Sequence, residues 1–308
     1  MSERKRLRIV FMGTPDFAVA CLNGLLASKH ELVAVVTAPD RPAGRGLKLQ
    51  ESAVKIAAVN GGIPVLQPEK LKAPDFIDGL KSLQADLFVV VAFRMLPELV
   101  WNMPPLGSIN LHASLLPAYR GAAPIQRAVM NGEKRTGLTV FKLQQEIDTG
   151  DVLGRQELEI GDDETAGQLH DRMMLVGAGL LTSVIDELAE GKHQGIPQEQ
   201  LMHSKVLPGA PKIFREDCLI HWHLSVQEIH NHIRGLSPYP SAYTILNGKS
   251  LKILRGEKMP GLKIMGEHEI QDGKILFRCG DGCYAVTQLQ PEGKKVMSAE
   301  EFLRGWRG

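Results

Sequence analysis

The stretch Asp86-Leu87-Phe88-Val89-Val90-Val91-Ala92 holds a near-continuous run of apolar residues. Such a run is typical of a strand that is buried on both faces, and strands of this kind occur mainly in parallel sheets. Further strand-like runs lie at residues 8–12, 32–38, 108–111 and 139–143, and helix-like segments such as 16–28 separate them. Alternating strands and helices predict an α/β fold, here a doubly wound, mostly parallel sheet.

Three residues stand directly after predicted strands: Gly13, Ala92 and His112. In an open α/β sheet, ligands bind beyond the carboxyl ends of the strands. Because parallel strands end at the same edge of the sheet, we expect one site that uses all three positions.

The second half of the chain shows a different pattern of predicted elements. Apolar residues at steps of three and four predict a helix over residues 165–190, which Gly191 ends. Residues 192–211 show no clear period and predict a linker. Short strand-like runs follow, with turn signals at Asn247-Gly248 and Asp272-Gly273, and predict a small sandwich or barrel, for which a five-stranded oligonucleotide-binding (OB) barrel is one option. We therefore predict a first domain at 1–191, a linker at 192–211 and a β domain at 212–308.

The composition is that of an ordinary globular protein. The apolar run at residues 9–12 is too short for a signal peptide or a membrane span. We expect a cytoplasmic protein that meets no membrane and acts as a monomer. The net charge of +1 does not by itself indicate a nucleic-acid partner. The scattered cysteines predict reduced structural thiols and no metal site; they are Cys21, Cys218, Cys279 and Cys283.

Chemistry-bearing residues cluster around Asn110-Leu111-His112. Two residues apart on a strand, Asn110 and His112 share one face. An amide donor beside an imidazole can stabilise an oxyanion and shuttle a proton. Asp148, if it reaches His112, would favour the protonated imidazole and fix its orientation. Taken singly, each residue could equally be structural: a strand-end Asn, a buried His with a hydrogen-bond partner and a loop carboxylate.

Two loops allow more than one interpretation. The turn at residues 13–18 lacks the Gly-x-Gly-x-x-Gly spacing of dinucleotide-binding sites, although the helix start after it could receive an anion. The loop at residues 39–48 carries Arg41, Arg45 and Lys48 among Gly and Pro. It is either a solvated loop or a segment that contacts the phosphates of a nucleic acid.

Together these residues resemble the methionyl-tRNA formyltransferase family, from residues 13–17 to residues 290–295. Asn110, His112 and Asp148 match the catalytic trio of the folate-dependent formyltransferases. The stretches 114–117 and 120–126 match the family's signature after the catalytic His, whereas 91–97 departs from the usual family sequence. The resemblance implies a Rossmann-like formyltransferase domain followed by an OB-like tRNA-binding β-barrel.

The resemblance also implies a reaction and its binding residues. The co-substrate would be 10-formyltetrahydrofolate, the acceptor initiator methionyl-tRNA, and no metal would take part. The implied folate-binding residues are Val91, Ala92, Phe93, Arg94, Leu96, Ser114, Leu115, Leu116 and Pro117. The implied tRNA-binding residues are Gly13, Thr14, Arg41, Arg45, Lys48, Lys212, Arg215, Lys294 and Lys295.

Three other functions fit the residues less well. A formyltransferase that acts on a sugar nucleotide or on glycinamide ribonucleotide would share the trio, but it would need neither the basic loop at 39–48 nor a C-terminal barrel. A nicotinamide dehydrogenase is disfavoured by the missing glycine fingerprint. A catalytically silent RNA-binding protein is disfavoured because Asn110, His112 and Asp148 are all present.

Overall fold

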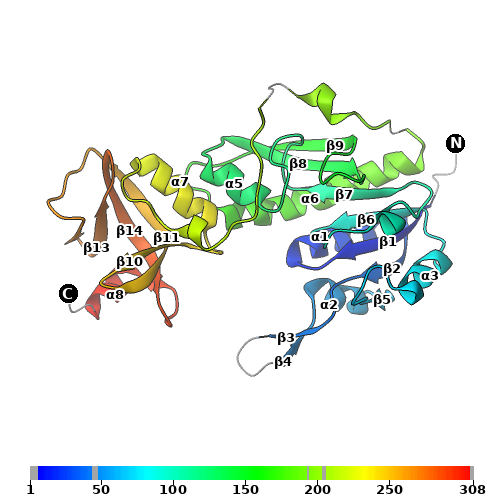
Figure 1. The fold of residues 1–308 in the computed structure, drawn as a ribbon, viewed down its shortest axis with the longest axis horizontal. Coiled ribbons are helices and arrows are strands. Elements are labelled where there is room, and N and C mark those ends of the chain that lie inside the picture. The colour runs from blue at the N-terminus through cyan, green and yellow to red at the C-terminus, as the bar shows by residue number, and fades with distance from the viewer. Residues whose placement is uncertain (1–5, 44–47, 193, 203–205, 306–308) are drawn as a thin grey trace. The chain divides into compact units, whose positions relative to one another are not determined.

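The chain divides into two units (Figure 1). The computed structural model describes residues 6–43, 48–192, 194–202 and 206–305. The first unit comprises Met1–Arg120, Gly137–Leu158 and His170–Pro208. The second unit comprises Gly121–Thr136, Glu159–Leu169 and Gly209–Gly308. Two segments that precede the predicted linker therefore fold with the C-terminal part of the chain.

A seven-stranded sheet in the order β5-β2-β1-β6-β7-β8-β9 forms the centre of the first unit. Neighbouring strands from β5 to β7 run parallel, and β8 runs antiparallel to β7. This confirms the prediction of a mostly parallel α/β sheet. The strands are β1 (Arg8–Gly13), β2 (Glu31–Val36), β5 (Val65–Leu66), β6 (Leu87–Val91), β7 (Ser108–His112), β8 (Arg135–Lys142) and β9 (Val152–Glu159).

Every residue of β6 is buried, as its apolar run predicts. Phe88 and Val90 pack with the buried residues Phe76 and Leu80 of a covering helix, α3. The helices around this sheet are α1 (Asp16–Leu26), α2 (Ala53–Asn60), α3 (Pro74–Ser82), α4 (Glu98–Trp101) and α6 (Ala166–Ala189), and a short hairpin of β3 (Arg41–Ala43) and β4 (Lys48–Gln50) follows β2.

The strand order reverses between β1 and β6, which makes the carboxyl edge of these strands a topological switch point. Because β1, β6 and β7 are neighbours, Gly13, Ala92 and His112 lie at one edge of the sheet, as the sequence predicts. On the opposite face of β7, Leu111 packs against α6 at Gly177, where a Cβ atom would lie only 2.8 Å from Leu111 Cδ2. Side chains alternate along a strand, so Asn110 and His112 point away from α6.

The second unit is built on an antiparallel sheet in the order β10-β11-β14-β13-β12, with β15 paired to β14. This confirms the smaller antiparallel β domain. Its core contains Ile229 and Ile233 of α7 together with Tyr284 and Val286 of β14. Its elements are α5 (Pro124–Met130), α7 (Val226–Leu236), β10 (Ala242–Leu246), β11 (Lys249–Pro260), β12 (His268–Gln271), β13 (Lys274–Arg278), β14 (Gly282–Pro291), β15 (Met297–Ser298) and α8 (Ala299–Arg304).

Local sequence signals explain where several of these elements begin and turn. Ser225 and Glu228 form a capping box that starts α7. Asn247 and Gly248 both take positive φ angles, of 49° and 73°, between β10 and β11. An Asn-Gly pair is the residue pair that such a two-residue hairpin turn favours. Along the described ranges of the chain, no helix is long and apolar enough to cross a membrane.

The segment 192–211, for which the sequence predicts a linker, carries more structure than the term implies. Ile196 pairs with Val152 through backbone hydrogen bonds of 2.8 and 2.9 Å. A short 3-10 helix, Gln198–Leu201, follows Pro197. A second 3-10 helix, Glu216–Cys218, lies further along the chain. The sequence does not signal these contacts, because they are made by backbone groups and by the side chain of Gln198. Neither kind of contact produces an apolar periodicity.

Candidate active site

Asn110 and His112 lie at the carboxyl end of β7. Asn110 pairs with Val90 of β6 and with Phe141 of β8, and His112 pairs with Thr139 of β8. Asn110 is half-buried and His112 is 8% exposed. The two neighbouring strands therefore fix the height and direction of both side chains at the switch-point edge.

The two ring nitrogens of His112 face different partners. Nε2 lies 2.9 Å from the carbonyl oxygen of Tyr119. A carbonyl can only accept, so Nε2 carries a hydrogen and donates it. Nδ1 faces the Oδ2 atom of Asp148 at 3.8 Å, within ion-pair range but beyond the length of a direct hydrogen bond. With Nε2 engaged by the Tyr119 carbonyl, Nδ1 is the ring nitrogen that faces the Asp148 carboxylate.

The segment after His112 is locked onto β8 by hydroxyl groups. Ser114 is fully buried, and its Oγ donates to the carbonyl oxygen of Ala118 at 2.6 Å. The Oγ1 of Thr139 donates to the carbonyl oxygen of Ser114 at 2.7 Å and accepts from the backbone N–H of Leu116 at 3.1 Å. These contacts hold the turn that presents the Tyr119 carbonyl to His112.

Asp148 stands in the loop between β8 and β9, in which residues 144–147 are exposed. Its side chain is 16% exposed, whereas Ile147 beside it is 59% exposed. Its φ is +55°, a left-handed conformation that Asp tolerates better than most residues. At Gly150 the backbone lies so close that a Cβ atom would fall 1.7 Å from the carbonyl oxygen of Lys142. The loop is thus packed tightly at its base and directs one carboxylate inward.

The structure therefore brings the predicted catalytic residues of this edge together, and their roles stay predictions. Asn110 and His112 share one face of β7, and Asp148 meets the imidazole from a neighbouring loop. The contribution of the Tyr119 carbonyl has no signal in the sequence, because any residue supplies a carbonyl. Throughout the described part of the chain, no group of three or more His, Cys, Asp or Glu side chains could hold a metal ion.

The predicted folate loop after β6 divides into buried and exposed positions. Val91 and Leu96 are buried, Phe93 is half-buried, and Ala92 is exposed with a φ of +47°. The guanidinium of Arg94 donates to the carbonyl oxygens of Glu69, at 3.0 Å, and Pro68. The Arg94 side chain is therefore held against the segment after β5. Of the other predicted folate residues, Ser114, Leu116 and Pro117 are buried and Leu115 is half-buried.

The predicted tRNA loop begins as the β3–β4 hairpin. Arg41 is exposed on β3, Lys48 is the first residue of β4, and Arg45 lies outside the described residues. Asp40, at the base of the hairpin, accepts hydrogen bonds from Lys55 and from Gln67, the latter at 2.8 Å. The hydrogen bond from Lys55 holds the pKa of Asp40 below its ordinary value. Thr14 is half-buried and Gly13 is buried.

The remaining predicted tRNA residues belong to the second unit and are exposed there. The Nζ of Lys212 lies 5.5 Å from the ring centroid of Phe214, and the guanidinium of Arg215 lies 5.8 Å from that of Tyr243. Lys294 and Lys295 are exposed just after β14. These cations are therefore accessible to a polyanion.

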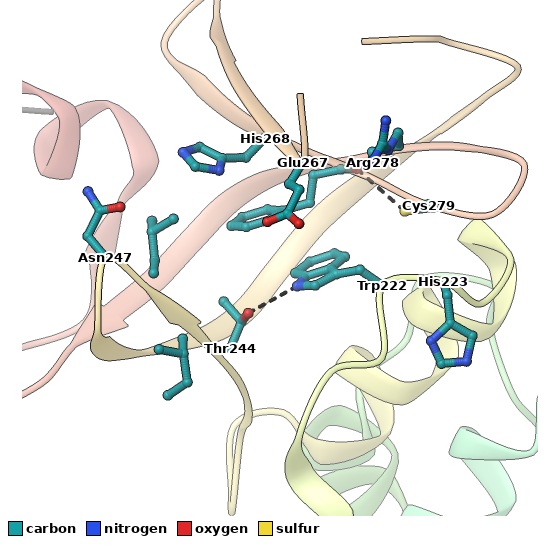
Figure 2. Close-up of a pocket in the computed structure, with 11 residues that line it drawn as sticks. Trp222, His223, Thr244, Asn247, Glu267, His268, Arg278 and Cys279 are labelled. Atoms are coloured by element: carbon teal, nitrogen blue, oxygen red, sulfur yellow. Dashed lines mark hydrogen bonds between the residues drawn. The ribbon is translucent and has the colours of Figure 1, made fainter. Parts of the chain in front are cut away.

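A cavity of about 480 Å³ lies in the second unit between the edge strand β10 and the strands β12 and β13 (Figure 2). Trp222 stacks on Phe277 at a centroid distance of 4.2 Å, and its Nε1 donates to Thr244 Oγ1 at 3.0 Å. Glu267 and His268 also line this cavity, and Figure 2 shows them above Trp222 in the view. None of the predicted catalytic residues lines it.

The four cysteines are buried, and none forms a disulfide. Burial raises the pKa of the Cys21 thiol to about 12, and burial likewise raises that of Cys279 to about 12. Such thiols stay protonated at neutral pH and are poor nucleophiles. Their environment is therefore that of structural side chains.

Known proteins match both halves of the chain. The family described as "Formyl transferase" matches residues 7–185, and "Formyl transferase, C-terminal domain" matches residues 212–307. The methionyl-tRNA formyltransferase of Bacteroides fragilis is 48% identical over 312 residues, covering 99% of this chain and 96% of that protein. That of Moorella thermoacetica is 44% identical over 305 residues, with coverage of 97% and 96%.

Solved structures with the same fold are more distant in sequence. HypX from Aquifex aeolicus, in complex with tetrahydrofolic acid, matches with a TM-score of 0.65 at 16% identity, over 97% of this chain and 47% of that chain. WlaRD, a sugar 3N-formyl transferase, matches with a TM-score of 0.66 at 20% identity, over 94% and 99%. The near full-length relatives and the two family matches together show that the chain belongs to the formyltransferase family, among the methionyl-tRNA formyltransferases.

Proposed function

We propose that this enzyme transfers a formyl group from 10-formyltetrahydrofolate to the α-amino group of methionine on initiator methionyl-tRNA, for the initiation of translation. The observation that carries the proposal is the 48% identity to a methionyl-tRNA formyltransferase over 99% of the chain. That identity spans the C-terminal domain as well as the domain that holds Asn110, His112 and Asp148.

In the proposed mechanism, Asn110 and His112 stabilise the negative charge that develops on the formyl oxygen. That charge appears when the neutral methionine amine attacks the formyl carbon. The Asn110 amide and the Nδ1–H of a protonated His112 are the donors, because Nε2–H is already engaged by Tyr119. Donors held in place before the reaction need no reorganisation in the transition state, which is why they accelerate it.

Asp148 handles the proton in this scheme. Its carboxylate lies 3.8 Å from Nδ1 and orients the imidazole, while Nδ1–H remains able to point at the formyl oxygen. Asp148 accepts the proton that the attacking amine loses, directly or through a water molecule, and His112 returns a proton to the departing folate nitrogen. The amine thus loses one proton, and the leaving nitrogen gains one.

For the tRNA, we infer that the β3–β4 hairpin lies by the acceptor stem and steers the aminoacyl end into the site. The exposure of Arg41 and the anchoring of the hairpin at Asp40 support this inference. The exposed cations Lys212, Arg215 and Lys294 would bind phosphates, which adds affinity without reading sequence. We also infer that the enzyme works as a monomer in the cytoplasm, where aminoacylated tRNA is used.

The test offers the enzyme a choice of amines. The protein is incubated with 10-formyltetrahydrofolate labelled in the formyl group, together with initiator methionyl-tRNA, glycinamide ribonucleotide and an amino-sugar nucleotide. We expect the label on the methionyl-tRNA. Label on a small amine in place of the tRNA would overturn the proposal and favour the small-substrate formyltransferases.

A further inference from the structure

Gln198 is a buried polar residue in the segment between the two family matches. It is 1% exposed and begins the 3-10 helix Gln198–Leu201. A buried amide costs free energy unless its donors and acceptor find partners. The partners that this side chain finds connect it to the proposed catalytic pair.

The side-chain amide of Gln198 reaches the loop of Asp148. Its Nε2 donates to the carbonyl oxygen of Asp148 at 2.9 Å and to that of Gly150 at 2.8 Å. Its Oε1 accepts from the Nε and Nη2 atoms of Arg120 at 3.1 and 2.6 Å. A guanidinium only donates and a carbonyl only accepts, so the orientation of this amide is fixed chemically.

These hydrogen bonds fix the backbone on both sides of the Thr149-Gly150 pair. Holding the carbonyls of Asp148 and Gly150 orients the Asp148–Thr149 and Gly150–Asp151 peptide planes. Asp148 keeps a φ of +55°, a conformation that the surrounding contacts must maintain. The direction of its carboxylate towards His112 follows from that backbone.

Arg120 extends the same network to the other side of the imidazole. It is the residue directly after Tyr119, whose carbonyl accepts the hydrogen of His112 Nε2 at 2.9 Å. One nitrogen of the imidazole thus depends on the turn that ends at Arg120. The other nitrogen, Nδ1, faces the loop that Gln198 holds. Gln198 and Arg120 are hydrogen-bonded to each other.

We propose that Gln198, braced by Arg120, is a positioning residue for formyl transfer: it sets the relative geometry of Asp148 and His112. The proposal rests on the proposed function, since it assumes that this pair handles the proton. Gln198 touches neither substrate in this account. It acts through the Asp148 backbone.

The experiment compares Gln198→Glu with a matched control, Gln200→Glu. A glutamate at 198 keeps the size of the side chain and an acceptor for Arg120, but it cannot donate to the two carbonyls and repels them. Gln200 is exposed in the same 3-10 helix, so the control adds the same charge without touching the loop. We expect Gln198→Glu to lower kcat roughly 10²-fold, the scale of a displacement by about 1 Å. KM should stay nearly unchanged, and Gln200→Glu should keep the wild-type kcat.

A double mutant separates positioning from general structural support. If Gln198 acts through Asp148, adding Gln198→Glu to Asp148→Asn lowers kcat no further than Asp148→Asn alone. A further loss in the double mutant, or a wild-type kcat in Gln198→Glu, would overturn the proposal. Should Gln198→Glu fail to fold, Gln198→Met removes the same hydrogen bonds without adding charge, and the same outcomes decide.

The assay that offers the enzyme several amines keeps this test independent of the proposed function. If the wild-type enzyme formylated another amine, the assignment to methionyl-tRNA would fall. The ratio of variant to wild-type kcat on that other amine would still decide whether Gln198 positions Asp148.

Discussion

His112 directs its Nδ1 atom at the Oδ2 atom of Asp148, 3.8 Å away, while its Nε2 atom donates to the carbonyl of Tyr119. The backbone contact engages Nε2 and leaves Nδ1 as the ring nitrogen that faces the carboxylate. In the proposed mechanism, Nε2 is therefore structural and Nδ1 is the nitrogen that exchanges a proton.

Replacing either His112 or Asp148 should strongly lower turnover. We expect His112→Ala and Asp148→Ala each to lower kcat by roughly 10²–10⁴-fold, the usual scale for positioned acid–base groups. Because the two act as one unit, the double mutant should be little slower than the slower single mutant. Steady-state kinetics at saturating methionyl-tRNA measures this, and near wild-type turnover in either single mutant would refute the assigned roles.

Folate binding should depend on the buried turn after β7 more than on the side chain of Arg94. The hydroxyl of Ser114 ties that turn to Ala118, so Ser114→Ala should loosen Leu115–Pro117 and weaken folate binding. Arg94 is held by the carbonyls of Pro68 and Glu69, so Arg94→Ala should be tolerated better. Fluorescence titration with a folate gives both affinities. If Arg94→Ala abolished binding while Ser114→Ala kept it, the side chain of Arg94 would be the folate contact.

Much of this fold can be predicted from the sequence because its signals are local. The apolar run of β6, the helix period of α6 and the Asn247-Gly248 turn each specify their element within a few residues. The grouping of the segments 121–136 and 159–169 with the C-terminal part of the chain is not predictable in this way. It depends on contacts between distant segments, such as the hydrogen bonds from Arg234 Nη1 to the carbonyls of Gly161 and Glu164, each at 3.0 Å.

Part of the candidate site can likewise be predicted from the sequence, and part of it cannot. The strand-end position of Asn110 and His112 follows from the pattern of β7. The contacts of Gln198 and Tyr119 do not, because one is a polar side chain in a segment without a period and the other is a backbone carbonyl. Such contacts are specified by the packed chain and leave no periodic trace in the sequence.

The two groups of basic residues should affect tRNA differently. Lys212→Ala and Lys294→Ala should raise KM for tRNA and reduce its salt dependence, with kcat nearly kept, as expected for phosphate contacts. Arg41→Ala should lower kcat as well, since misplacing the amine by about 1 Å can cost on the order of 10²-fold. It should also blunt discrimination between initiator and elongator tRNAs. Kinetics on both tRNAs at two salt concentrations checks this.

If the hairpin does not position the tRNA, the double mutant Arg41→Ala/Arg45→Ala will keep the wild-type kcat and the wild-type discrimination between the two tRNAs. The hairpin would be a solvated loop, and the assignment of formyl transfer would be unaffected.

The second unit should lose stability as the solution becomes acidic, in part through His230. Burial lowers the pKa of His230 below its ordinary value, and the nearby charge of Lys258 adds to this effect. The unfolded chain then binds a proton that the folded chain does not, at pH values just below the ordinary pKa of 6.5. The free energy of unfolding is therefore highest above that pH and falls as the pH drops below it.

Urea unfolding at pH 7.5 and at pH 5.5 measures this contribution. We expect His230→Gln to reduce the loss of stability between the two pH values. The matched control is His268→Gln, because His268 is an exposed histidine of the same unit. An equal loss of stability in wild type and in His230→Gln would show that burial of His230 does not contribute.

A single-turnover reaction with enzyme in excess over initiator methionyl-tRNA tests formyl transfer to methionine. Formyl-labelled 10-formyltetrahydrofolate is added, the tRNA is recovered, its ester is hydrolysed, and the released amino acid is identified. The wild-type enzyme should form labelled N-formylmethionine rapidly, and His112→Ala should form it at least ~10²-fold more slowly. Unlabelled methionine after many turnover times, or equal rates for the two enzymes, would contradict this prediction.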